Sequence, residues 1–144
     1  MRLMLDTSVL VASMVRSHPR HASAVRWHGR AKGGEHAFLV AAHTLAELYS
    51  VLTRLPLSPR IGPGLARRLV HENVEVPARI VTLRGSDYGA VLRSVSELGL
   101  TGGVIYDALI ARAAERSGVD RLLTLNPEDF RRVWPSGGGI IRTP

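Results

Sequence analysis

Short apolar runs alternate with amphipathic segments along this chain of 144 residues, and the alternation limits the possible folds more than any other property. The first run, residues 2–5, stops at Asp6 and is typical of a buried strand. Strands that alternate with helices indicate an α/β fold whose mostly parallel sheet of four to five strands is covered by helices on both faces, in three layers. We expect strands at residues 2–5, 36–41, 79–83 and 121–125, and a fifth at the sheet edge at 139–142.

The expected helices are marked by apolar residues spaced three and four apart and by glycine or proline near their ends. They cover residues 7–15, 20–31, 44–55, 65–72, 88–98 and 105–117. Residues 57–64 are rich in proline and glycine and indicate a loop. The chain has no repeat, no low-complexity tract and no obvious linker, so we expect a single domain over residues 1–144.

The composition narrows the classes of function. The formal net charge is +7, and every basic residue except Lys32 is an arginine, which favours polyanionic partners such as nucleic acid. The absence of cysteine excludes disulfides, zinc–thiolate sites and thiol catalysis. No apolar stretch reaches the roughly 18 residues of a membrane span, and residues 1–6 do not read as a signal peptide. We therefore expect a soluble protein of the cytoplasm that does not enter a membrane.

Acidic residues are the candidates for a functional site. In parallel sheets the functional groups gather at the carboxyl ends of the strands, which directs attention to Asp6 and to residues 126–129. Two further acids, Glu47 and Asp107, lie in expected helices. The helix around Asp107 is rich in alanine, so an acid there is costly to bury unless it is paired or holds a metal.

Each of these positions also has an ordinary structural interpretation. Asp6 can cap the first helix. Thr44 and Glu47 fit a capping box, and Glu47 also fits a solvated helix face. Asp107 can interact with the helix dipole, and residues 126–129 have the chemistry of a turn and of a helix start. Taken together, however, clustered carboxylates repel one another, and a divalent cation such as Mg²⁺ or Mn²⁺ relieves that repulsion.

The acidic residues lie within four short motifs that occur in a fixed order. They are Asp6-Thr7-Ser8, the pattern Thr-x-x-Glu-Leu at 44–48, Asp-Ala-Leu-Ile-Ala at 107–111, and Leu-Leu-Thr-x-Asn-x-x-Asp-Phe at 122–130. In their order and spacing these motifs resemble the PIN domain family, over nearly the whole chain. The short length and the Gly102-Gly103 break are similar to the VapC toxins of VapBC toxin–antitoxin pairs.

The resemblance implies a PIN-like fold and an endoribonuclease that uses Mg²⁺, or Mn²⁺, to hydrolyse RNA phosphodiester bonds. One position departs from the family, because many relatives have aspartate where this chain has Asn126. Either Asp129 then acts as a catalytic acid in its place, or a second metal binds weakly there. The resemblance makes Asp6, Glu47 and Asp107 catalytic metal ligands, with Ser8, Thr7, Asn126 and Thr124 in supporting positions.

The same resemblance implies three partners: an RNA substrate, a small cognate antitoxin protein and a second copy of the chain in a homodimer. The helical face formed by Leu45, Leu48, Tyr49 and Leu52 could receive an antitoxin segment, although core packing would explain most of that face.

The alternative is a PIN-like module that binds RNA or protein without catalysis. A receiver domain is excluded because no lysine follows a late strand. A P-loop protein and a Rossmann cofactor site are excluded because their glycine motifs are missing.

Overall fold

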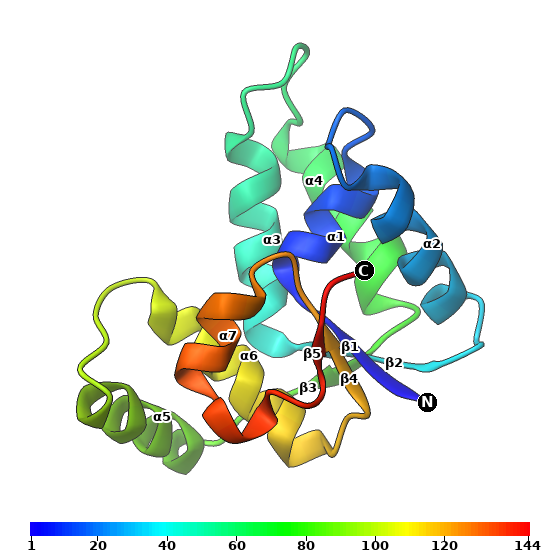
Figure 1. Ribbon diagram of the computed structural model, residues 1–144. Coiled ribbons are helices and arrows are strands. Elements are labelled where there is room, and N and C mark those ends of the chain that lie inside the picture. The colour runs from blue at the N-terminus through cyan, green and yellow to red at the C-terminus, as the bar shows by residue number, and fades with distance from the viewer.

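A computed structural model describes residues 1–144 as five strands and their covering helices (Figure 1). All the strands are parallel, and their order across the sheet is β3-β2-β1-β4-β5. The predicted α/β class with helices on both faces is confirmed. The strands are β1 (Arg2–Leu5), β2 (Ala37–Ala41), β3 (Arg79–Val81), β4 (Arg121–Leu123) and β5 (Ile141–Arg142).

The helices pack on the sheet in two groups. Helices α1 (Thr7–Met14), α2 (His21–Lys32), α3 (Ala42–Arg54) and α4 (Pro63–Val70), with the π-helical turn η1 (His71–Glu75), share one core. Helices α5 (Gly85–Glu97), α6 (Val104–Ser117) and α7 (Pro127–Val133) share the other, followed by the short turn η2 (Pro135–Gly137). No helix is both long and apolar enough to span a membrane.

Alternating residues of each strand supply the two cores. Along β1, Leu3 and Leu5 face the core of α1–α4, whereas Met4 faces the core of α5–α7. In β4, the fully buried Leu122 and the adjacent Leu123 divide in the same way. A strand buried on both faces must be apolar at nearly every position, which explains the continuous apolar runs in the sequence.

The structure corrects several boundaries. Helix α4 begins inside the expected loop 57–64, α5 begins three residues before the expected 88, and β5 begins two residues after the expected 139. Helix α3 begins at Ala42 rather than at Thr44. Strands β3 and β4 end two residues earlier than expected, at Val81 and Leu123. Helix α7 was not predicted as a helix, although its first position is Pro127 and acids occupy its first turn. The sequence analysis noted the helix-start chemistry of these residues but predicted no helix after them.

Candidate active site

The candidate site lies where β1 and β4, neighbours in the sheet, both end. Leu5 pairs with Leu123 in the register of these strands, and the backbone amide of Asp6 donates to the Leu123 carbonyl at 2.9 Å. Asp6 also caps α1, which confirms the structural interpretation of this residue. Its side chain is only 2% exposed. A carboxylate buried to this extent needs partners.

Two hydroxyl groups hold one oxygen of the Asp6 carboxylate. Ser8 Oγ donates to Asp6 Oδ2 at 2.6 Å, and Thr124 Oγ1 donates to the same oxygen at 2.8 Å. Each hydroxyl in turn accepts from a backbone amide, that of Leu125 for Ser8 (2.9 Å) and that of Asn126 for Thr124 (3.0 Å). The other carboxylate oxygen, Oδ1, receives no hydrogen bond from the protein. The network therefore fixes the carboxylate and leaves Oδ1 free for a ligand.

The hydroxyl of Thr7 behaves differently from that of Ser8. It is buried and has no hydrogen-bond partner, whereas Ser8 contacts Asp6 directly. Of the two residues, Ser8 is the one that orients the carboxylate.

Asp6 opens onto a cleft of about 540 Å³, which also contains Glu47 from α3 and Asp107 from α6. The three acids are far apart in the sequence and come from three different elements. The sequence analysis grouped them, and the structure places them around the same cavity. The cleft is lined by Asp6, Thr7, Ser8, Val11, His18, Pro19, Arg20, Glu47, Val51, Asp107, Leu125 and Asn126.

The electrostatics of the cleft disfavour negative charge. Burial raises the pKa of Asp107 to about 7, and the charges of Asp6, Asp129 and Glu47 add to this rise. Burial also raises the pKa of Asp6, although its hydrogen bonds from Ser8 and Thr124 oppose the shift. Because the site disfavours the charged form of its own carboxyl groups, a bound cation would stabilise that charged form.

Glu47 is held by a residue that the sequence analysis did not single out. His43 lies one turn earlier on α3, and its Nε2 is 3.2 Å from Glu47 Oε2. The His43 ring stacks on Tyr106, with the ring centroids 4.8 Å apart and the planes 4° from parallel. Because Tyr106 directly precedes Asp107, this contact joins the helices that carry the two acids. The i,i+4 spacing of His43 and Glu47 was the available signal.

The capping-box interpretation of Thr44 and Glu47 is wrong. Helix α3 begins at Ala42, so Thr44 lies inside its first turn and its hydroxyl is buried without a partner. The alternative of a fully solvated Glu47 is also wrong, because that side chain is 26% exposed and paired with His43.

Asn126 and Asp129 occupy different positions at the start of α7. Asn126 lines the cleft at the N-cap and makes no side-chain capping hydrogen bond. Asp129 does not line the cleft, and its Oδ1 lies 3.5 Å from Arg132 Nη1. Asp129 acts on the site through its charge, because that charge contributes to the raised pKa of Asp107.

Two basic side chains complete the cleft. His18 and Arg20 belong to the loop between α1 and α2, and His18 Nδ1 accepts a hydrogen bond from the Arg20 amide at 3.0 Å. Arg20 brings a positive charge to the same cavity as the three acids. Sequence analysis did not place this loop beside the three acids.

The oxygen donors of the cleft are of the type that Mg²⁺ and Mn²⁺ prefer. As they lie, no three histidine, aspartate or glutamate side chains are close enough together to coordinate one ion. Mg²⁺ usually keeps several waters and binds protein through one or two carboxylates. The residues present thus fit a hydrated ion held by few direct ligands.

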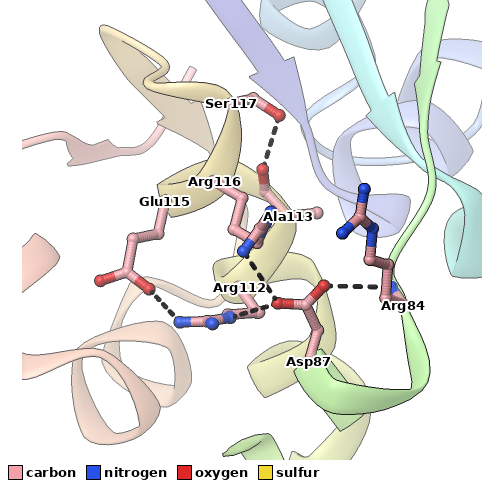
Figure 2. A network of polar contacts seen from close by, with 7 residues as sticks. All are labelled: Arg84, Asp87, Arg112, Ala113, Glu115, Arg116 and Ser117. Atoms are coloured by element: carbon pink, nitrogen blue, oxygen red, sulfur yellow. Dashed lines mark hydrogen bonds and ion pairs between the residues drawn. The ribbon is translucent and has the colours of Figure 1, made fainter.

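A second buried aspartate lies outside the cleft (Figure 2). Asp87 on α5 accepts from Arg112 Nε at 3.0 Å, lies 3.4 Å from Arg116 Nη1 and accepts from the Arg84 amide at 3.0 Å. The hydrogen bond from that amide is the main cause of its lowered pKa, to which the two arginines on α6 add. This network links α5 to α6, and none of its residues lines the cleft that contains Asp6, Glu47 and Asp107.

Comparison with known proteins agrees with this geometry. Residues 3–134 match the family model described as "PIN domain". The chain is 38% identical to Ribonuclease VapC27 of Mycobacterium tuberculosis over 112 residues, which are 78% of this chain and 76% of that protein. It is 37% identical to Ribonuclease VapC40 of the same species over 128 residues, 89% of this chain and 87% of that protein.

Among solved structures, the fold is similar to VapBC2 from Rickettsia felis bound to a DNA fragment from its promoter. The TM-score is 0.68 at 20% identity, covering 99% of this chain and 98% of the other. At this level of identity the similarity supports the fold alone.

Proposed function

This chain belongs to the PIN domain family, and on that premise we propose that it is a divalent-metal-dependent endoribonuclease of the VapC type. The observation that carries the proposal is the cleft in which Asp6, Glu47 and Asp107 converge, with the pKa of Asp107 raised to about 7. A structural acid would be paired with a cation, as Asp87 is. The acids of the cleft instead surround a solvent-accessible space.

In this proposal Asp6, Glu47 and Asp107 hold a hydrated Mg²⁺, or Mn²⁺, with one or two of these carboxylates bound directly and the rest through the ion's waters. Asp129 adds negative charge from the edge of the site. The bound ion supplies activation of a water and stabilisation of charge on the phosphate and on the leaving oxygen. Ser8 and Thr124 keep Asp6 in one orientation, with Oδ1 available. Thr7 and Asn126 line the cleft as neutral polar groups, and Arg20 offers its guanidinium to a phosphate.

The test combines metal binding with cleavage. We expect calorimetric titration with Mn²⁺ to show binding that is lost in Asp6→Asn and Asp107→Asn, together with loss of RNA cleavage. Glu97→Gln is the matched control, because it removes an exposed acid of α5 away from the cleft. Unchanged Mn²⁺ binding in the cleft variants would contradict the assigned ligands.

A module that binds RNA or protein without cutting is the second candidate. Asn126, a neutral amide at the rim of the cleft, is the observation that favours it. The Mn²⁺ titration separates the two candidates, because a pure binding module has no need to bind the ion. RNA binding with neither Mn²⁺ affinity nor cleavage would support the second candidate.

We further propose that residues 1–144 act as a single domain in the cytoplasm, as the toxin of a toxin–antitoxin pair. Its partner would be a small antitoxin whose arginine enters the cleft and compensates the same carboxylates that hold the metal. Within the expected docking face of α3, Leu48 and Leu52 are fully buried in the core. Only Tyr49, which is exposed, and the half-buried Leu45 remain for an antitoxin segment or for the homodimer.

Expression alone and expression together with the product of the adjacent upstream gene test the toxin assignment. Growth arrest that co-expression relieves, with copurification of the two proteins, is the expected result. Sedimentation of the purified chain tests the homodimer. An active nuclease that is harmless in cells and copurifies with no partner would remove the toxin assignment and leave the nuclease assignment intact.

A further inference from the structure

Arginines begin three of the five strands. Arg2, Arg79 and Arg121 are the first residues of β1, β3 and β4. Because every strand is parallel, all three lie at the same edge of the sheet, at the opposite end of the strands from Asp6 (Figure 1). In the strand order β3 and β1 flank β2, and β4 lies beyond β1. The connection from α2 to β2 passes along the same edge.

A second cavity, of about 340 Å³, opens at this edge. Arg2, Lys32, His36 and Arg79 line it, and we refer to these four residues as the basic edge. His36 stacks on Trp27, with ring centroids 5.9 Å apart, and both of its ring nitrogens are buried without a hydrogen-bond partner. The ring N–H of this imidazole has no hydrogen-bond acceptor, and an oxygen of a bound anion can act as one.

The charges around the cavity are not balanced within the protein. Glu35 is paired with Arg30 at 2.7 Å. Asp120 accepts from the backbone amide of Arg2 at 2.6 Å, so its single negative charge offsets only part of the positive charge of the four basic-edge residues. Lys32 donates to the neutral amide oxygen of Asn73, and Arg79 has no carboxylate partner. The cavity therefore combines uncompensated positive charge with an unpartnered imidazole, which is the chemistry of a phosphate site.

We propose that the basic edge is a second phosphate-binding site, which holds the backbone of single-stranded RNA outside the catalytic cleft. The proposal rests on the ribonuclease function proposed above. The ring of Trp27 already contacts His36 and lies 5.1 Å from the guanidinium of Arg30 and 5.8 Å from that of Arg121. Because the Trp27 ring already makes these contacts, we expect the basic edge to bind phosphates through its charges rather than to stack on a base.

The test compares the double variant Lys32→Gln/Arg79→Gln with Arg60→Gln/Arg93→Gln. The control removes the same charge from two exposed arginines, one in the α3–α4 loop and one on α5, neither with a carboxylate partner. Binding of a fluorescent RNA of roughly 16 nucleotides is measured by anisotropy in EDTA, where metal-dependent cleavage is stopped. We expect Lys32→Gln/Arg79→Gln to weaken binding on the order of tenfold and to lower the slope of log K against log salt by about 1.4.

A second measurement is independent of RNA chemistry. Titration of the full chain with inorganic phosphate, followed by NMR of the histidine rings, should shift the His36 signals in the wild type and in the control. Lys32→Gln/Arg79→Gln should abolish that shift while its thermal unfolding stays close to that of the control. A folded double variant with unchanged salt slope and unchanged His36 response would overturn the proposal.

The experiments distinguish a wrong assignment of the basic edge from a wrong assignment of the ribonuclease function. If the wild type neither binds nor cuts RNA, the ribonuclease function fails, and the proposed RNA site fails with it. If the wild type cuts RNA and both double variants bind it equally well, only the second site is refuted.

Discussion

Asp6 and Asp87 are both 2% exposed, yet their surroundings shift the pKa of the two carboxyls in opposite directions. The Arg84 amide, followed by Arg112 and Arg116, stabilises the charge of Asp87 and lowers its pKa. Asp6 has hydroxyl donors and a carboxylate neighbour, and burial raises its pKa. Burial alone therefore does not separate a structural acid from a site acid. The identity of the partners does.

The largest expected contrast between the two regions is in catalysis. Asp6→Asn, Glu47→Gln and Asp107→Asn should each reduce kcat/KM for RNA cleavage by about 1,000-fold, since each removes a metal ligand that stabilises charge in the transition state. Asp87→Asn should leave the cleavage rate per folded molecule unchanged and lower the Tm by several degrees, because Arg112 and Arg116 lose their counter-charge. Cleavage assays and thermal unfolding on the same preparations check both. A cleft variant within tenfold of wild-type activity would remove its residue from the site.

The next effect concerns the residue that orients Asp6. Thr124→Val keeps the shape of a fully buried side chain but removes its hydrogen bond to Asp6 Oδ2. We expect metal affinity to fall by about 10- to 100-fold, as for other groups that orient a ligand. Mn²⁺ titration measures this effect, with the exposed Thr82→Val as the control. Equal Mn²⁺ affinity in the two variants would show that Ser8 alone is sufficient.

Much of this site could be predicted from the sequence because its elements are local. Asp6 follows a buried strand, and Asp107 opens a helix of alanines. The motifs suggested Ser8 and Thr124 as supporting residues, but the hydrogen bonds that both hydroxyls donate to Asp6 Oδ2 could not be predicted, because the one from Thr124 joins distant parts of the chain. Thr124 is 118 positions from Asp6. The stacking of His43 on Tyr106 likewise depends on how α3 packs against α6, which periodicity does not determine.

The fold, like the site, could be predicted only in part. The parallel sheet followed from the alternation of elements, whereas the start of α3 was misplaced because Thr44 and Glu47 imitate a capping box. The true N-cap, Ala41, offers no side-chain oxygen, so the sequence contains no capping signal at that position. Tertiary packing of Leu48 and Leu52 against the sheet determines where α3 lies.

A smaller contrast appears in the pH dependence of stability without metal. The pKa of Asp107 rises from 3.8 to about 7 on folding, so the folded state binds the proton more tightly. The resulting stability is fully present below pH 3.8 and is lost as the pH rises through about 7. Asp87 contributes the opposite dependence, because its lowered pKa gives stability that is lost as the pH falls.

Asp107→Asn should therefore match the wild type in acid and exceed it by about 1–2 kcal/mol near neutral to alkaline pH, after allowance for solvent screening of a partly exposed group. Urea unfolding in EDTA across the pH range measures the difference. A wild-type advantage above neutral pH would mean that Asp107 has a cationic partner, as Asp87 does.

The smallest effects concern the start of α7. Asn126→Asp adds a carboxylate at the rim of the cleft and should preserve or increase cleavage by a few-fold. Asp129→Asn should slow cleavage a few-fold, because it removes charge that reaches Asp107. Steady-state cleavage at several Mg²⁺ concentrations measures both. Loss of activity in a folded Asn126→Asp variant would assign Asn126 to the turn alone.

The hydroxyls of Ser8 and Thr124 also hold the chain beyond the end of β4, through the amides of Leu125 and Asn126. These two amides are protected by side chains of the site rather than by a neighbouring strand. Their exchange with deuterium would follow the opening of the Asp6 carboxylate rather than the fraying of a strand end. The exchange rates of these two backbone amides would thus report how often the hydrogen-bond network around Asp6 is closed, even without metal or RNA.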